Sequence, residues 1–264
     1  MSRMYLSTSL AWGEPLIETI QRAHALGASG VEVWAEQVWR QSEDPIRLKA
    51  EGDRLSVGRT VHGPSWDLNL CSINSTVLKA SVKATLDAVE LTERLGADIL
   101  VVHPGRSSLN GYFDTYHRAE LKRSYVEICV HAGEHGVRIG LEAMERLPKE
   151  FLCGSQEVND FLGEVRSEGV ENIGVVVDVA HLTTISDDPL RAIADFQGLI
   201  ELHISNTTPG KLHTPLDDGT LDFSKLLPSL EEQYRVPIVI EGISVSSGYD
   251  LLTRNAKAYL RAIG

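Results

Sequence analysis

Short apolar runs alternate with longer amphipathic stretches along the whole chain. Eight of the runs are typical of buried strands, namely residues 4–8, 30–34, 57–62, 98–103, 137–142, 173–178, 200–204 and 237–241. Near-continuous apolar runs indicate strands that are covered on both faces, as in a parallel sheet. Because strands alternate with helices, and because eight strands are the number that closes a barrel, the pattern favours a (β/α)8 architecture.

The stretches between the runs have a helical period. Two apolar stripes advance in steps of three and four residues, Leu78–Val82–Leu86–Val89 and Leu121–Tyr125–Ile128–Ala132. Such stripes belong to helices that pack on a sheet. The alternative is an open doubly wound sheet, but no GxGxxG motif follows the first strand. We therefore predict an α/β protein whose residues 1–264 form a single (β/α)8 TIM-barrel domain.

The composition limits the choice of partners. The 264 residues carry a net charge of −12, which gives no general attraction to nucleic acids or membranes. Three cysteines without CxxC spacing, Cys71, Cys129 and Cys153, are typical of reduced thiols in a cytoplasmic protein. No apolar run approaches the roughly 18 residues of a membrane span. We expect a cytoplasmic protein with a small-molecule substrate, with no membrane partner and with nucleic acid disfavoured; a homo-oligomer is left open.

Most of the predicted strands end in a side chain that can bind a metal. These side chains are His62, His103, Glu142, Asp178, His203 and Glu241, with His181 just beyond Asp178 and His213 in the loop after the seventh strand. The C-terminal ends of barrel strands meet on one face, so all eight should surround one site. Imidazoles and carboxylates together suit zinc, manganese, iron or cobalt better than calcium. The competing interpretation of Glu142 and Glu241 is a salt bridge to lysine or arginine.

Further side chains near the strand ends are candidates for substrate binding. Trp34 and Trp66 could cover the apolar face of a sugar ring, although packing at the rim explains large aromatics equally well. Arg106 and Lys211 could hold a phosphate or carboxylate, although such residues are more often solvated charges. The segment GISVSSG after the last strand is a candidate phosphate-binding loop. Glu32, near the end of the second strand, is a weaker candidate.

The order H, H, E, D-x-x-H, H, H, E resembles the xylose isomerase-like TIM barrels, a superfamily of sugar and sugar-phosphate isomerases and epimerases, dehydratases and endonuclease IV. The resemblance covers all eight predicted strands. It implies a metal quartet of Glu142, Asp178, His203 and Glu241, as in the epimerase branch. His62, His103, His181 and His213 match further positions that complete a three-zinc site in endonuclease IV. One departure is clear, because Lys211 stands where endonuclease IV has a metal-binding aspartate. The positive charge of the lysine opposes binding of a third ion.

The resemblance implies a metal-dependent isomerase or epimerase that acts on a small sugar or sugar-phosphate-like substrate through an enediolate. One to three divalent ions are implied, most simply zinc or manganese, with cobalt, iron or magnesium as alternatives. Glu142 and Glu241 would exchange the substrate proton as base and acid, and His181 would shuttle a hydroxyl proton. A hydride shift, a dehydratase, an endonuclease IV-like zinc hydrolase of the AP endonuclease family 2 type, and a non-catalytic binding barrel are the alternatives.

Overall fold

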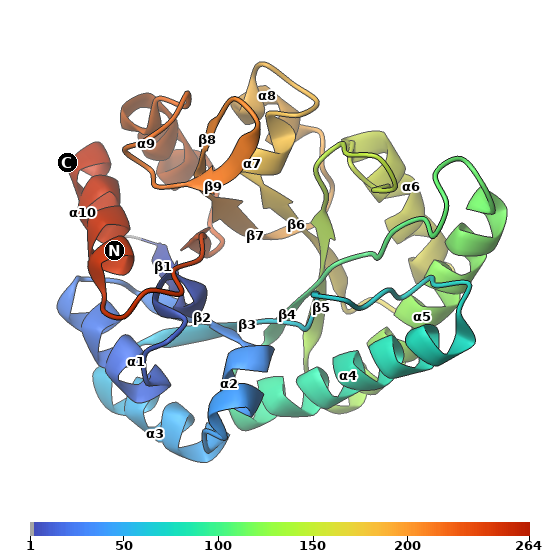
Figure 1. Ribbon diagram of the computed structural model, residues 1–264, viewed down its shortest axis with the longest axis horizontal. Coiled ribbons are helices and arrows are strands. Elements are labelled where there is room, and N and C mark those ends of the chain that lie inside the picture. The colour runs from blue at the N-terminus through green and yellow to red at the C-terminus, as the bar shows by residue number, and fades with distance from the viewer. Residues whose placement is uncertain (1–2) are drawn as a thin grey trace.

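Eight parallel strands close on themselves in the computed structural model, which describes residues 3–264 (Figure 1). They are β1 (Met4–Ser7), β2 (Gly30–Trp34), β3 (Gly58–His62), β4 (Ile99–Val102), β5 (Arg138–Ala143), β6 (Ile173–Asp178), β7 (Leu199–Ile204) and β10 (Ile238–Ile240). Their order around the barrel is β1-β10-β7-β6-β5-β4-β3-β2, so the first strand and the last strand pair and complete the ring. The predicted (β/α)8 barrel is confirmed.

Helices surround this ring on the outside (Figure 1). They are α1 (Leu16–Ala25), α2 (Ala35–Gln41), α3 (Pro45–Leu55), α4 (Ser75–Arg94), α5 (Asp114–Glu134), α6 (Ser155–Arg166), α7 (Val179–Leu182), α8 (Pro189–Ala194), α9 (Phe223–Gln233) and α10 (Asp250–Ile263), with a short 3-10 helix at Thr8–Ala11. The two predicted stripes lie on α4 and α5, and seven of their eight side chains are buried, Leu86 being partly so. No helix within residues 3–264 is both long enough and apolar enough to cross a membrane.

The inside of the barrel changes from apolar to polar along the strands. A small apolar plug of Ile99, Val101 and Val176 lies inside, with Ile200 packed against it. A register shift between β6 and β7 occurs at Val175 and Val176, next to this plug. Further along β7 the interior is charged, because Glu201 and His203 are fully buried and contact each other. The plug therefore forms a dry floor beneath a layer of ionisable groups.

The strand boundaries differ from the predicted ones by a residue or so, and one element was not predicted. β8 (Asn206–Thr208) and β9 (Lys211–Thr214) form an antiparallel hairpin after β7. This segment is short and polar, with no alternating apolar pattern to mark it as strands. The hairpin carries His213 back toward the barrel mouth, where its ring lies 5.3 Å from that of His181.

Candidate metal centre

Four side chains from adjacent strands converge at the C-terminal end of the barrel. Glu142, Asp178 and His203 lie near or at the ends of β5, β6 and β7, and Glu241 follows β10 directly. All four are buried, and each offers one ligand atom within 4.8 Å of the others. These residues are far apart in the sequence, but they meet because neighbouring parallel strands bring their C-terminal ends together. The predicted quartet is therefore one cluster.

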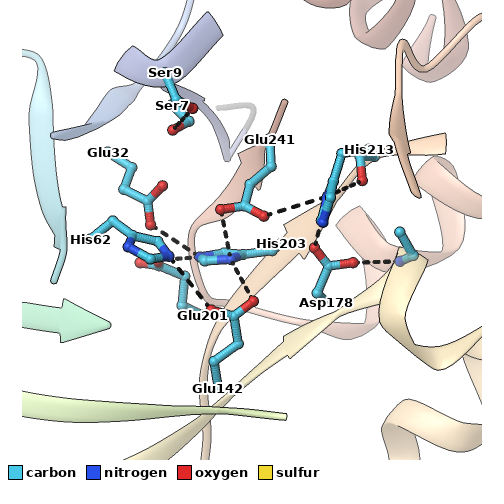
Figure 2. A network of polar contacts seen from close by, with 12 residues as sticks. Ser7, Ser9, Glu32, His62, Glu142, Asp178, Glu201, His203, His213 and Glu241 are labelled. Carbon is cyan, nitrogen blue, oxygen red and sulfur yellow. Dashed lines mark hydrogen bonds and ion pairs between the residues drawn. The ribbon is translucent and has the colours of Figure 1, made fainter. Parts of the chain in front are cut away.

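His203 stands in the middle of this cluster. Its Nδ1 lies 3.2 Å from Glu241 Oε1 and 3.5 Å from Glu142 Oε1. Figure 2 shows the two carboxylates on opposite sides of the imidazole, with Asp178 beyond them toward His213. The ring nitrogen and the carboxylate oxygens thus face a common point.

Several of these atoms are buried without a hydrogen-bond partner. They are Glu142 Oε2, Asp178 Oδ2 and His203 Nδ1. Within the described residues, the ion-pair partners of the three carboxylates in the quartet are all histidines, so the salt bridge to lysine or arginine is not formed. Buried charge without a cation is costly, whereas a divalent ion would both compensate it and use the free ligand atoms. The donor set, three carboxylates and one imidazole, fits such an ion.

Asp178 has two separate tasks. Its Oδ1 accepts hydrogen bonds from the backbone N–H groups of Ala180 and His181 and so caps α7. Its Oδ2 stays available on the side of the quartet, 3.8 Å from His213 Nδ1. The D-x-x-H pattern is therefore a helix cap that also presents a ligand atom. His181 is fixed by its Nδ1, which lies 3.0 Å from the carbonyl oxygen of Ala143.

A second group of ligand atoms shares Glu142. His62 Nε2 and His103 Nε2 lie 3.6 Å and 2.9 Å from Glu142 Oε2. The 2.9 Å approach lacks hydrogen-bond geometry, since Glu142 Oε2 has no hydrogen-bond partner. His62 Nδ1 bonds to the Gly63 carbonyl oxygen, which leaves Nε2 facing the carboxylate. These three residues form a compact group that could hold an ion beside the quartet.

A third group, Asp178, His181 and His213, lies on the other side of the quartet. His213 comes from β9 and is held by a 3.0 Å hydrogen bond between its Nδ1 and Ser205 Oγ. Its φ of 56° is a left-handed value that costs energy in a residue other than glycine. Lys211 lies two residues earlier on β9; it is exposed and is not among the residues that line the cavity beside the quartet.

The electrostatics of the cluster are those of carboxylates facing imidazoles. Burial opposes ionisation of Glu142, but the charges of His103 and His203 prevail and hold its pKa well below the usual range. Burial likewise opposes protonation of His62 and His181, yet neighbouring carboxylates raise the pKa of each to about 9. Protons therefore occupy the place that a cation would take, and binding of a cation must displace them.

A layer of charge lies directly beneath His203. Glu32 from β2 and Glu201 from β7 are fully buried, and each approaches His203 Nε2, at 3.1 Å and 3.0 Å respectively. Burial raises the pKa of Glu201 to about 7, although His203 opposes the rise. Glu32, a weak substrate-binding candidate from the sequence, does not line the cavity and points into the barrel (Figure 2).

A cavity of about 570 Å³ opens above the cluster. Trp34, Trp66 and Arg106 line it together with His62, His103, Glu142, His181, His213 and Glu241. Trp34 stacks on His62 with ring centroids 3.9 Å apart, and its indole N–H donates to Ser7 Oγ. Trp66 is half exposed and lies against Trp34 at 5.0 Å. The cavity thus has an aromatic wall on one side and ionisable groups at its base.

Sequence reasoning missed several residues of this region. Glu145 lines the cavity, and its Oε2 lies 3.5 Å from His181 Nε2. Glu145 could have been found from its position three residues after Glu142, just past the end of the strand. Glu201 shares a strand face with His203, two residues away, so a buried alternation of charges was visible in ELHIS. Ser9, also at the cavity, donates to the Gly242 carbonyl oxygen and gave no signal.

The segment after β10 has part of its backbone already engaged. The Ser244 N–H donates to the carbonyl oxygen of Ser9 at 3.0 Å. The Gly248 N–H donates to the carboxylate of Glu14. A carboxylate at this place repels an anion, so the loop offers less to a phosphate than its glycines and serines suggest.

Comparison with known proteins places the chain in a wider context. The sequence profile described as xylose isomerase-like TIM barrel matches residues 20–263. An uncharacterized protein of Methanocaldococcus jannaschii is 28% identical over 188 residues, which are 68% of this chain and 62% of that protein, so the match spans about three fifths of the relative. A probable endonuclease 4 of Thermoplasma acidophilum is 23% identical over 166 residues, 61% of this chain and 55% of the relative.

Solved structures with the same fold cover nearly the whole chain. A D-tagatose 3-epimerase-like protein superposes with a TM-score of 0.81 at 22% identity, covering 99% of this chain and 98% of that one. An L-ribulose 3-epimerase gives a TM-score of 0.81 at 18% identity, covering 100% and 95%. At these identities the likeness establishes the fold.

Proposed function

Because this chain belongs to the xylose isomerase-like TIM barrels, we propose that it is a metal-dependent epimerase or isomerase of a small, unphosphorylated keto sugar. The observation that carries the proposal is the buried quartet of Glu142, Asp178, His203 and Glu241, two of whose carboxylates, Glu142 and Glu241, line a 570 Å³ cavity. The two solved structures named above bear the names of keto-sugar 3-epimerases, which supports the same chemistry.

The quartet would hold the cation through its free ligand atoms, among them Asp178 Oδ2 and His203 Nδ1. A divalent ion there supplies Lewis-acid stabilisation to the carbonyl and hydroxyl oxygens of the substrate. Zinc and manganese suit the donor set, and cobalt, iron and magnesium are also compatible with it.

Proton transfer falls to Glu142 and Glu241. They reach the centre from β5 and from the end of β10, on opposite sides of His203 (Figure 2). The pKa of each is held low, Glu142 by His103 and His203 and Glu241 chiefly by His203, although burial opposes the shift in both. One carboxylate takes the proton from one face of the carbon beside the carbonyl, and the other, once protonated, returns a proton to the opposite face. The configuration at that carbon is thereby inverted.

His181 is the candidate for moving the hydroxyl proton. Its Nδ1 is engaged with the Ala143 carbonyl oxygen, so Nε2 is the nitrogen that faces Glu145 at the cavity wall. A proton received at Nε2 can pass to the Glu145 carboxylate and back. This role matches the proposal from the sequence that His181 acts as a shuttle.

The cavity favours a neutral ring or chain. Trp34 and Trp66 form an apolar wall that suits the C–H face of a sugar. Arg106 is a lining cation, whereas Asp67, Glu142, Glu145, Glu150 and Glu241 are lining carboxylates, so the balance of charge disfavours a phosphate group. Lys211 is exposed and lies outside the lining, so the geometry of the cavity gives no support to its proposed contact with an anionic substrate.

The direct test incubates the purified protein with Mn²⁺ or Zn²⁺ and a panel of ketoses in D2O. We expect interconversion of a pair that differs at one carbon, with one deuterium incorporated at that carbon. Conversion without deuterium identifies a hydride shift, and loss of water identifies a dehydratase. Failure to convert any ketose with either ion, while the metal is bound, rejects the proposal.

A zinc hydrolase remains the second candidate because of the two flanking ligand groups, His62–His103–Glu142 and Asp178–His181–His213. A Glu142 shared between two ions would suit the activation of a water nucleophile. The probable endonuclease 4 among the relatives points the same way. Assay with a phosphodiester substrate, together with metal counting, decides between the two: one ion favours the epimerase, and two ions that share Glu142 favour the hydrolase.

A further inference from the structure

Two carboxylates lie beneath His203, on the side away from the cavity. Glu201 Oε1 makes a 3.0 Å hydrogen bond with His203 Nε2, and Glu32 Oε2 lies 3.1 Å from the same nitrogen. All three side chains are fully buried. Neither carboxylate lines the cavity, so neither can touch a substrate held there. Figure 2 shows Glu32 and Glu201 to the left of the His203 ring, with Glu241 above the ring and Glu142 below it.

We propose that Glu201 and Glu32 are positioning residues. Glu201 accepts the Nε2–H of His203, Glu32 lies against the same nitrogen, and together they aim the His203 Nδ1 at the metal. The inference rests on the proposed function only in assuming that the quartet binds a divalent ion. It assigns a role to two buried acids that the proton-transfer mechanism does not use.

The argument begins with the two nitrogens of a neutral imidazole, of which one donates and the other accepts. Nδ1 of His203 is buried, has no hydrogen-bond partner and lies between Glu142 and Glu241. Nε2 meets Glu201 and Glu32. The opposite tautomer would set the lone pair of Nε2 against two carboxylates, which is repulsive. When a cation at the quartet takes the place of the Nδ1 proton, the tautomer that keeps the Nε2–H is therefore the favoured one.

The two acids come from different places and constrain the ring in different directions. Glu201 is two residues before His203 on β7, whereas Glu32 reaches across from β2 and has neither oxygen in a hydrogen bond. The strand partner of Glu32, Thr60, also has a buried hydroxyl without a hydrogen-bond partner. Because only the Glu201 contact has full hydrogen-bond geometry, Glu201 is the principal acceptor, and Glu32 limits rotation of the ring from the far side.

A rival explanation is that Glu32, Glu201 and His203 hold an ion of their own, since each has a ligand atom within 4.8 Å of the others. An ion bound at Nε2 would require that nitrogen to lose its proton. Since Nδ1 is already directed at the quartet, His203 would have to become an imidazolate. The hydrogen-bonded arrangement avoids this cost, and the two explanations differ in how many ions the protein binds.

The experiment compares wild type with Glu201→Gln, Glu201→Met and Glu32→Met, using Mn²⁺ alone as the probe. A glutamine oxygen can still accept the Nε2–H, whereas methionine fills the space without an acceptor. We expect Glu201→Met to weaken Mn²⁺ binding by about 10- to 100-fold, the range typical of residues that orient a ligand, with Glu201→Gln close to wild type. Glu32→Met should fall between the two, and the number of ions per chain should not change.

Leu141→Met on β5 is the matched control, because it places the same side chain at a buried strand position within the main hydrophobic core. In the zinc-loaded protein labelled with 15N-histidine, the wild type and Glu201→Gln should show a protonated Nε2 at His203.

Loss of one ion in both Glu201 variants supports the inner-ion rival and overturns the proposal. Unchanged Mn²⁺ affinity in folded Glu201→Met also overturns it, and Glu32→Met supplies the same test if Glu201→Met does not fold. The Mn²⁺-binding experiment uses no sugar, so its result stands even if the epimerase assay fails. A wild type that binds neither Mn²⁺ nor Zn²⁺ overturns both this inference and the proposed function.

Discussion

Single side chains at the barrel mouth combine structural and chemical tasks. Asp178 caps α7 with one oxygen and offers the other to the cluster, and Trp34 both stacks on His62 and donates to Ser7. Substitution of such a residue disturbs packing and chemistry together. Glu241 is a cleaner probe, because the ion-pair partners of its carboxylate within residues 3–264 are histidines and the chain around it is a loop.

Glu241→Gln should leave the fold intact and abolish most of the activity. The change is nearly isosteric but removes the charge and the proton-transfer group that the proposed function assigns to this residue. We expect turnover to fall by roughly 10²–10⁴-fold, the usual contribution of a general acid or base, with weaker metal binding. Activity assays and elemental analysis measure both effects, with exposed Glu232→Gln as the control. A variant with full metal occupancy and normal turnover rules out both roles.

Lys211→Asp tests whether the third ligand group can be completed. Asp178, His181 and His213 already offer atoms within 4.8 Å of one another, and Lys211 lies two residues before His213. An aspartate in its place supplies an anionic ligand, so we expect one more zinc per chain than in wild type. Lys211→Met removes the charge without adding a ligand and should not add an ion. An unchanged zinc count in Lys211→Asp with a sharply raised KM points instead to an anionic substrate held by Lys211.

At the scale of elements, the β8–β9 hairpin decides where His213 stands. Asn206 ties the hairpin to the following loop, because its side chain donates to the carbonyl oxygens of Leu216 and Leu221 and accepts from the N–H groups of Thr207 and Leu221. Gly219 passes close to this amide. A β-carbon on Gly219 would lie 2.2 Å from Asn206 Oδ1.

Gly219→Ala should therefore destabilise the protein through this hairpin. Overpacking of a tight contact typically costs about 1–3 kcal/mol, and we expect a loss in that range in urea unfolding. Displacement of His213 should also weaken the third ligand group while the quartet keeps its metal. Gly163→Ala on α6 is the control, since a β-carbon there meets nothing within 4 Å. Equal stability of the two variants contradicts the assignment.

The strands and the order of the elements could be predicted from the sequence because apolar runs recur eight times, with helical stretches between them. The quartet could be placed together for the same reason, since each member lies at or near a strand end. The hairpin could not be predicted, because a short polar segment has no period to recognise. Glu201 was overlooked because its partner, Glu32, is far away in the sequence and only the closed barrel brings them to the same histidine.

For the molecule as a whole, the charge cluster links stability to pH. His62 and His181 have pKa values of about 9 in the folded, metal-free protein, against a usual value near 6.5. The folded state thus binds these protons more tightly than the unfolded chain. Their stabilising contribution is complete below about pH 6.5 and is lost as the pH rises through about 9.

We therefore expect the Tm of chelator-treated protein to fall between pH 6.5 and pH 9. The Tm of the zinc-loaded protein should fall less over the same interval, because the cation replaces the protons as the partner of the carboxylates. Calorimetry at both pH values, with and without zinc, measures the difference. Exposed His24→Gln should keep the wild-type slope. A Tm of the metal-free protein that is constant or rises over this interval contradicts the charge arrangement.

The pairing of β1 with β10 has a consequence for how the protein matures in the cell. Glu142 emerges from the ribosome long before Glu241, since about 100 residues separate them, and synthesis at roughly 5–20 residues per second takes about 5–20 s for that distance. During this interval the ring is open, and the nascent chain has an incomplete set of ligands. An ion held by this incomplete set would be bound weakly and would exchange with the free ions of the cell. If the quartet binds an ion as proposed, the choice of metal is therefore made after translation ends, by the closed barrel.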